Sequence, residues 1–171
     1  PTPSSAASDV YKRQGYIEYE EKILNKLRGQ FAFVIYDKIT NELFMARDRI
    51  GIKPLYYSVN DNWILFGSEI KAIELSKLIE FEPDIDSYLA YLRHLCVPAD
   101  STGNKNIKKL EPGQFIRIDK NGKISKKIYW DPFTFSVNHD LNEKNVVEEL
   151  DRLLNESVEY RKVSDVEVGL F

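Results

Sequence analysis

The sequence predicts an α+β domain in which antiparallel sheets are flanked by helices. Four short apolar segments follow one another between residues 31 and 66, and each is joined to the next by a short connection. Parallel neighbours would need long crossovers, so these segments are predicted to pair antiparallel. Segments with helical spacing of apolar residues lie before and after this block. The 171 residues suffice for one domain, or for one domain and part of another.

The first fourteen residues, PTPSSAASDVYKRQ, differ in composition from the rest of the chain. They are rich in Ser, Ala and Pro and have no hydrophobic periodicity. Residues 9–14 look like the translation of a transposon adapter end used in sequencing libraries. We therefore expect residues 1–14 to be a disordered processing scar and exclude them from the fold prediction. A natural disordered leader is the alternative.

The first regular element is predicted at residues 16–29, where the apolar residues follow helical spacing and Gly29 is a natural end. The four apolar segments come next and are predicted to form one antiparallel meander. Residues 31–36 and 43–46 are apolar on both faces, which is typical of strands that are covered on both sides. The third and fourth strands, 54–59 and 63–66, are separated by Asn-Asp-Asn, which tolerates tight turns.

Capping residues predict where the later helices begin. Ser68 can cap a helix whose first residue, Glu69, suits the positive end of the helix dipole. Asp84 can cap a second helix that extends to about residue 95. Near the C-terminus, Asn142 can cap a long helix with one apolar face.

A hairpin is predicted between residues 114–119 and 123–130, because Lys-Asn-Gly at 120–122 is a strong turn signal. Residues 131–140 lack periodicity and are predicted as a linker. The last residues, 166–171, have the composition of a buried strand.

Composition and charge exclude several classes of function. The net charge of −3 gives no electrostatic case for binding nucleic acid or an acidic membrane. No apolar run reaches the roughly 18 residues of a membrane span, and no signal peptide is recognisable. Cys96 is the only cysteine, so no internal disulfide can form, and with two histidines in the chain we expect no metal site. A reducing, cytoplasmic location is the default expectation.

The turn RDRIGIKP has the strongest concentration of candidate site residues. Arg47, Asp48 and Arg49 cluster beside Gly51 and Pro54. The cluster can be read as catalytic, or as a set of charges that fix the turn by pairing with one another or with exposed backbone. We favour the structural interpretation, because turn-linked ion pairs commonly serve structure.

Two further candidates also have structural explanations. Glu69 resembles an active-site carboxylate, but its predicted place at a helix start gives it a sufficient role. Cys96 follows an apolar helix face, so we expect a buried, unreactive thiol.

Seven segments together resemble the glutamine-hydrolysing asparagine synthetases, a class II amidotransferase family whose glutaminase domain has an N-terminal nucleophile. The resemblance extends over roughly nine-tenths of the chain, and its strength lies in the order of the segments. They are FAFVIYD (31–37), LFMARDRIGIKPLYY (43–57), FGSEIKAI (66–73), VPAD (97–100), IKKLEPGQFIRID (107–119), YWDP (129–132) and SVEYRKVSDVEVGLF (157–171).

The resemblance implies a fold and a division into domains. Residues 15–134 would be a partial αββα sandwich of the N-terminal-nucleophile type. Residues 135–171 would be a linker and then the first helix and strand of an α/β ATP-pyrophosphatase domain. Arg47, Asp48, Gly51, Pro54, Ser68 and Glu69 would form a structural motif near the glutaminase site.

The resemblance also implies a two-part reaction in the parent enzyme. In that family a first-residue Cys, with its free α-amine as base, releases ammonia from glutamine. A second domain adenylates the aspartate carboxylate with ATP and Mg²⁺, and ammonia then attacks the adenylate. Glutamine, aspartate and ATP are thus the implied partners, and a homodimer is compatible with the family.

The residues that perform this chemistry are expected to lie outside the chain. The nucleophilic Cys and the glutamine-binding residues would precede Tyr16, and Cys96 has its nitrogen in a peptide bond. The pyrophosphate loop would follow Phe171, which by resemblance is the one ATP-binding candidate. We therefore expect an inactive fragment, truncated at both ends. The alternatives are an amidotransferase that acts on another carboxylate, and a non-catalytic binding module.

Overall fold

The computed structural model describes residues 5–97, 100–136, 142–162 and 169, with no side-chain detail for residues 5–9. The chain divides into two compact units. One comprises Glu21–Pro132, and the other comprises Pro1–Glu20 together with Phe133–Phe171.

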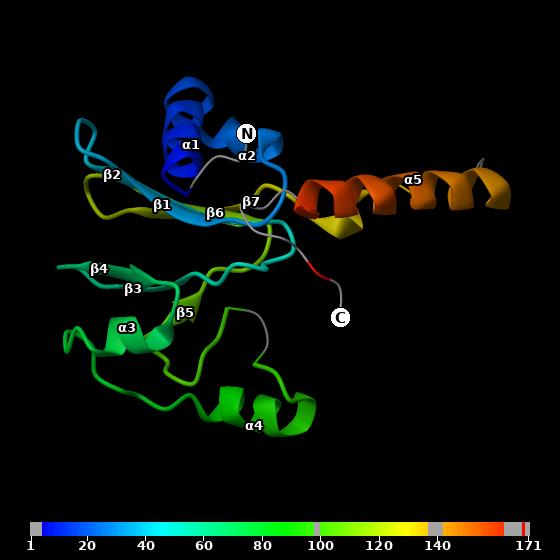
Figure 1. Cartoon of the computed structure of the whole chain (residues 1–171). Coiled ribbons are helices and arrows are strands. Elements are labelled where there is room, and N and C mark those ends of the chain that lie inside the picture. The colour runs from blue at the N-terminus through cyan, green and yellow to red at the C-terminus, as the bar shows by residue number, and fades with distance from the viewer. Residues whose placement is uncertain (1–4, 98–99, 137–141, 163–168, 170–171) are drawn as a thin grey trace. The chain divides into compact units, whose positions relative to one another are not determined.

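The unit Glu21–Pro132 contains two antiparallel sheets, which confirms the α+β prediction (Figure 1). The larger sheet has the strand order β1-β2-β6-β7, and the smaller sheet has the order β4-β3-β5. The strands are β1 (Ala32–Asp37), β2 (Glu42–Arg47), β3 (Tyr56–Val59), β4 (Ile64–Gly67), β5 (Lys108–Lys109), β6 (Gln114–Ile118) and β7 (Ile124–Ile128).

The predicted four-stranded meander is wrong. β1 pairs with β2 and β3 pairs with β4, as expected, but β2 and β3 belong to different sheets. The second neighbour of β2 is β6, with Leu43 opposite Ile118. The connection between Arg47 and Tyr56 therefore carries the chain from one sheet to the other, and the candidate turn lies at this transition.

The hydrophobic core lies between the two sheets. Side chains of β2 and β6 form its centre, and Tyr57, Val59 and Ile64 of the smaller sheet pack against them. The central residues are Leu43, Met45, Leu55, Leu110, Ile116 and Ile118, each at most 9% exposed. Because β2 also carries the fully buried Phe44, it is covered on both faces, as its uniformly apolar sequence predicts.

The opposite face of the larger sheet carries an aromatic row. The ring centroids of Phe33 and Phe44 lie 6.1 Å apart, and those of Phe44 and Phe115 lie 5.3 Å apart. Figure 1 shows α2 (Ile23–Lys26) on this side of the larger sheet, with α3 (Ile70–Glu74) and α4 (Ile85–His94) beyond the smaller sheet. The order of layers is helix, sheet, sheet, helix, which is compatible with the predicted amidotransferase sandwich.

The N-terminal helices differ from the prediction. A single helix was expected at 16–29, whereas the structure has α1 (Ser5–Tyr19), the 3₁₀ turn η1 (Glu20–Lys22) and α2. The break falls at Glu20, whose φ of 48° is left-handed and interrupts an α-helix. Residues 5–14, expected to be disordered, are helical as part of α1, and residues 1–4 lie outside the described residues.

The capping predictions are confirmed at two of three positions. The Asp84 carboxylate accepts hydrogen bonds from the Ser87 backbone N–H and hydroxyl at the start of α4. Asn142 Oδ1 accepts from the Asn145 N–H at 2.9 Å, and α5 (Glu143–Lys162) follows. The cap of α3 is Glu69 rather than Ser68, and its side chain makes no capping bond.

The hairpin of β6 and β7 is confirmed, with Ile118 opposite Ile124. Residues 131–140 begin with a short 3₁₀ turn, η2 (Pro132–Thr134), and residues 137–141 lie outside the described residues. The strand expected at 166–171 lies outside them too, except Gly169. Among the described helices none has the length and apolarity that a membrane span requires.

Candidate functional site

Arg47 ends β2 and binds three backbone carbonyls around the turn. Its Nε donates to the Lys53 carbonyl at 2.8 Å, and its two terminal nitrogens donate to the carbonyls of Leu110 and Gly51 at 2.6 and 2.5 Å. Arg47 as a whole is 8% exposed. The planar fork of an arginine suits such divergent acceptors, so Arg47 holds the turn against the segment that enters β6.

Asp48 is a second, still more buried anchor of the same turn. At 1% exposure, its carboxylate accepts hydrogen bonds from four backbone N–H groups. The donors are Phe31 at 3.3 Å, Ile50 at 3.2 Å, and Ile52 and Lys53 at 3.0 Å. One side chain thus satisfies the donors of the turn and ties it to the residue before β1.

The backbone groups of Arg47 and Asp48 form hydrogen bonds with residues that are distant in sequence. Asp48 N–H donates to the Phe31 carbonyl at 2.8 Å, and Gly113 N–H donates to the Asp48 carbonyl at 3.0 Å. The Tyr129 hydroxyl donates to the Arg47 carbonyl at 2.8 Å. The turn therefore joins the start of β1, the start of β6 and the residue after β7.

Two glycines permit this close packing. Gly51 has a φ of +73°, and a Cβ there would lie 2.7 Å from the Pro112 side chain and 3.0 Å from the Arg47 guanidinium. Gly113 has a φ of +66°, and a Cβ there would lie 2.2 Å from the Trp130 carbonyl oxygen. A larger residue at either position would meet both a steric and a conformational penalty.

The protonation of the turn follows from burial and hydrogen bonding. Burial alone would raise the pKa of Asp48, but the N–H donors of Lys53, Ile52 and Phe31 outweigh it, and the pKa lies below its ordinary value. Burial lowers the pKa of the Arg47 guanidinium, and the Asp48 charge opposes this. Burial also raises the pKa of Tyr129, so its hydroxyl stays protonated and remains a donor.

The other predicted site residues do not join this network. Pro54 follows the turn and is half-buried, whereas Ser68 and Glu69 are exposed at the start of α3. Arg49 is half-buried, and its Nε has no hydrogen-bond partner among the described residues. Phe171, the ATP-binding candidate, lies outside the described residues.

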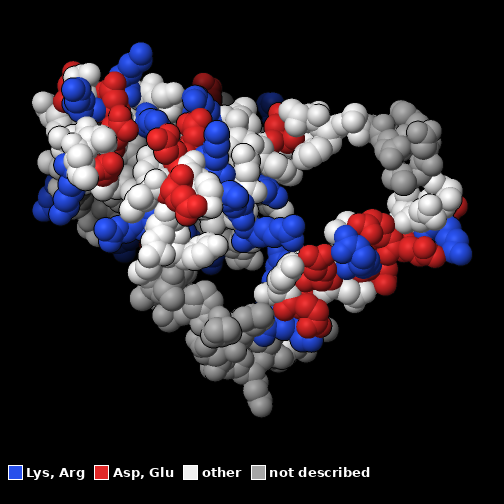
Figure 2. Space-filling model, turned by 90° about the horizontal axis from the view of Figure 1, so that it is seen from above, with Lys and Arg blue, Asp and Glu red and all other residues white. Residues whose placement is uncertain are grey.

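The prediction for Cys96 is wrong, because the thiol is exposed. The apolar face of α4 that was expected to bury it points to solvent, so the thiol that follows the helix is left uncovered. Within the part of the chain that the structure describes, no group of three acidic, histidine or cysteine side chains could hold a metal ion. On the face seen in Figure 2, basic and acidic side chains are interspersed.

A groove of about 490 Å³ lies beside the edge of β3. Polar side chains that line the groove hydrogen-bond to the protein backbone. Ser58 Oγ donates to the Asn106 carbonyl at 2.5 Å, and the Asn106 side-chain amide donates to the Glu80 carbonyl at 3.0 Å. Lys105 at its rim is paired with Glu82 at 2.8 Å. Among the described residues that line the groove, no nucleophile lies beside a base.

Several partners of the turn were not singled out as site residues, namely Phe31, Leu110, Gly113 and Tyr129. Gly113 had a visible signal, because Glu-Pro-Gly at 111–113 is a turn sequence. The other three bind the turn from 17, 63 and 82 residues away in sequence, and no local pattern identifies such pairs.

The helix–sheet–sheet–helix layers and the sheet-crossing turn define a scaffold of the amidotransferase class. The profile of the glutamine amidotransferase domain family matches residues 9–130, and the chain belongs to this family. The match begins inside the segment 1–14 and ends at the residue after Tyr129.

Similar proteins carry names from amide metabolism. The chain is 36% identical over 156 residues to asparagine synthetase (glutamine-hydrolysing) 1 of Bacillus subtilis, covering 91% of this chain and 24% of that protein. It is 35% identical over 159 residues to asparagine synthetase 3 of the same organism, with coverages of 91% and 25%. It is 33% identical over 161 residues to amidase chry2 of Gibberella zeae, with coverages of 91% and 23%. The chain thus spans about a quarter of the length of these relatives.

Proposed function

We propose that this chain is part of the glutaminase half of an ATP-dependent amidotransferase of the asparagine synthetase type. In the whole protein, ammonia released from glutamine would be transferred to an ATP-activated aspartate carboxylate. The observation that carries the proposal is the family match over residues 9–130, together with relatives whose names state glutamine hydrolysis.

The described residues would contribute a scaffold to this reaction rather than reacting groups. Arg47 and Asp48 bind backbone groups, so they position β1 and β6 relative to the turn between the sheets. Cys96 is internal, and its nitrogen is in a peptide bond, so it lacks the free α-amine that activates an N-terminal thiol. We therefore expect no glutaminase activity from the 171-residue polypeptide itself.

ATP and Mg²⁺ do not fit the described residues. No described cluster of three acidic, histidine or cysteine side chains is suitable for a metal, and the only ATP-binding candidate lies outside the described part. Activation of the acceptor would therefore depend on parts of the parent protein other than the described residues.

Two alternatives differ in what the whole protein does. The first alternative is an amidotransferase that acts on another carboxylate. It is supported by the similarity to amidase chry2 of Gibberella zeae, because a relative that is not named as an asparagine synthetase shares this domain. A non-catalytic module of the same fold is consistent with the structural partners of the turn.

The proposal is tested by a chimera of Bacillus subtilis asparagine synthetase 1 in which residues 15–162 replace the aligned segment. We expect the purified chimera to release glutamate from glutamine and to form asparagine with aspartate and ATP. The unmodified synthetase is the positive control, and asparagine formation from ammonium reports whether the synthetase half is intact. Formation from ammonium without glutamate release would contradict the proposal and favour the non-catalytic module. The acceptor is tested in the full-length parent protein, by comparing aspartate with other carboxylates.

A further inference from the structure

The turn between β6 and β7 carries a pair of neighbouring residues, Asn121 and Gly122, that can react with each other. Asn121 is the only asparagine in the sequence that is followed by Gly. In such a pair the Gly backbone nitrogen can attack the side-chain carbonyl carbon of the Asn, because Gly has no side chain that hinders the approach. Among the asparagines of this chain, Asn121 is therefore the one for which this attack is least hindered.

The structure leaves both residues open to solvent. Asn121 and Gly122 are exposed at the tip of the hairpin. A Cβ added at Gly122 would meet no atom within 4 Å. The tip therefore has space for a cyclic product and for the water that would open it.

Asp119 holds the same turn closed. Its carboxylate accepts hydrogen bonds from the backbone N–H groups of Asn121 at 2.8 Å and Lys123 at 2.9 Å. Hydrogen bonds from Lys123 and Asn121 lower the pKa of Asp119, so the carboxylate is charged at neutral pH. The Asp119 carbonyl accepts from the Gly122 N–H at 2.9 Å, and this is the nitrogen that must lose its proton and attack. The attacking nitrogen is thus engaged while the turn is closed, and it reacts when the tip opens.

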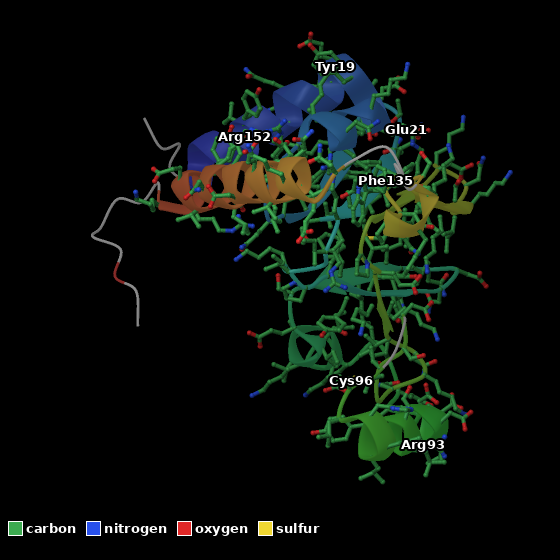
Figure 3. All side chains as sticks on the ribbon, turned by 90° about the vertical axis from the view of Figure 1, so that its right-hand side faces the viewer. Tyr19, Glu21, Arg93, Cys96, Phe135 and Arg152 are labelled. Carbon is green, nitrogen blue, oxygen red and sulfur yellow. The ribbon has the colours of Figure 1, made fainter. Side chains whose placement is uncertain are left out.

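Opening can be confined to the tip, because the other end of β7 is held by separate contacts. Lys127 Nζ lies 3.4 Å from Oε1 of Glu21, which is labelled in Figure 3. The Tyr129 hydroxyl donates to the Arg47 carbonyl at 2.8 Å. An exposed turn between two held strands can open locally without unfolding of the domain.

We propose that Asn121–Gly122 is a site of spontaneous modification, at which Asn121 is converted to aspartate and isoaspartate at a rate set by the hydrogen bonds of Asp119. The Gly122 nitrogen loses its proton and forms a bond to Cγ of Asn121. The Cγ–Nδ2 bond breaks, and Nδ2 leaves as ammonia with a proton in place of the one lost. Water then opens the resulting succinimide at one carbonyl to give aspartate, or at the other to give isoaspartate. Water is the only co-reactant, and the reaction is independent of the proposed amidotransferase function.

The modification weakens the tip of the hairpin. Either product places a second carboxylate close to that of Asp119, and isoaspartate also adds a methylene to the main chain of the turn. The Gly122 N–H donates to the Asp119 carbonyl, and the Asp119 N–H donates to the Lys123 carbonyl at 3.1 Å; a longer chain cannot keep the geometry of both bonds. Directly after the turn, Ile124 pairs with the buried Ile118. We therefore expect modified chains to unfold at a lower urea concentration than unmodified ones.

Incubation of the 171-residue chain at neutral pH, followed by peptide mapping with mass spectrometry, tests the site. We expect the peptide with Asn121 to gain the mass of deamidation before the peptide with Asn41, an exposed turn asparagine that precedes Glu42. The product should contain isoaspartate. Gly122→Ala should slow the reaction several-fold in the chain unfolded in guanidinium chloride, where only the hindrance by the added Cβ acts. Modification of Asn121 no faster than that of Asn41, or an unchanged rate in unfolded Gly122→Ala, overturns the proposal.

The control of the rate by Asp119 is tested in the folded chain. Asp119→Ala should raise the rate at Asn121 about tenfold, toward the rate in the unfolded chain, because two hydrogen bonds that close the turn are lost. Asp37→Ala is the matched control, because the Asp37 carboxylate accepts from the N–H groups of Ile39 and Thr40 in the β1–β2 turn, at 2.8 and 3.4 Å. It should leave the rate at Asn121 unchanged.

Circular dichroism verifies that both variants fold, and the comparison of folded with unfolded wild type needs no variant. A folded wild-type chain that reacts as fast as the unfolded one overturns the control by Asp119. Equal rates at Asn121 in Asp119→Ala and in Asp37→Ala overturn it as well.

Discussion

Replacement of Asp48 by Asn tests whether one carboxylate organises the crossing between the two sheets. The substitution keeps the size of the side chain but removes its charge and turns one acceptor oxygen into an NH₂ donor. The native carboxylate accepts from four backbone N–H groups at 3.0–3.3 Å, and it is 1% exposed. The single amide oxygen can retain at most about two of these contacts.

The expected loss of stability follows from the bonds that cannot be kept. Hydrogen bonds to a charged group contribute about 1.5–3 kcal/mol each, so two lost bonds amount to about 3–6 kcal/mol. That is a large part of the roughly 5–15 kcal/mol that stabilises a typical domain. Asp48→Asn should therefore lower the urea midpoint severely, or leave the chain unfolded.

The assay is urea unfolding followed by tryptophan fluorescence and circular dichroism. Asp119→Asn is the matched control, because this carboxylate also accepts two turn N–H groups, at 2.8 and 2.9 Å, but at the surface. It should lose much less stability than Asp48→Asn. Equal losses in the two variants would refute the assigned role of Asp48.

The pH dependence provides a second test of the same carboxylate. Because the folded pKa of Asp48 lies below the ordinary value near 4, its contribution is complete above that value and is lost as the pH falls through the folded pKa. The stability difference between wild type and Asp48→Asn should therefore shrink in acid. A difference that stays constant from neutral pH to strong acid would contradict this assignment.

Three further predictions use the same unfolding measurement or a thiol assay. Gly113→Ala should lower the free energy of unfolding by about 3 kcal/mol or more, because its Cβ would lie 2.2 Å from the Trp130 carbonyl oxygen. Gly122→Ala is the control: Gly122 has a φ of +79° and no atom within 4 Å of the added Cβ, so the loss should be only about 1 kcal/mol. Similar losses in the two variants would argue against the close packing at Gly113. Tyr129→Phe should lose about 1 kcal/mol at neutral pH, with the loss of one hydrogen bond. Since the pKa of Tyr129 is raised, the wild type should lose stability as the pH rises above about 10 and the variant should lack that component; identical alkaline profiles would contradict it. Cys96 should react with a thiol reagent as fast in the folded chain as in urea, because it is exposed, and protection in the folded state would contradict its placement.

The parts of the fold that were predicted from sequence depend on interactions between near neighbours. The Asp84 and Asn142 caps bind N–H groups three residues away, and the turn 120–122 joins adjacent strands. Such contacts leave a local pattern of residue types. The α3 cap was displaced by one residue because both Ser68 and Glu69 have plausible capping chemistry, and the backbone at Glu69 decided between them.

The parts that were not predicted depend on residues far apart in sequence. A meander was the natural inference for four strands with short connections, yet β2 pairs with β6, which joins Leu43 to Ile118. Cys96 was expected to be buried because α4 is amphipathic, but periodicity does not reveal which face is turned inward. The contacts of Asp84 and Tyr88 with Gly103 make that choice.

By itself, the sequence was sufficient to determine the α+β class, the hairpins and the family to which RDRIGIKP and its neighbouring segments belong. The fold class, the hairpins and the family can be recognised from local residue types and from their order along the chain. Only the tertiary structure decided what the turn does. Arg47 binds a carbonyl 63 residues away, and Asp48 binds an N–H 17 residues earlier. Buried backbone groups need hydrogen-bond partners wherever packing places them. Because two sheets pack together here, the charged side chains of Arg47 and Asp48 bind the backbone groups of the connection between the sheets.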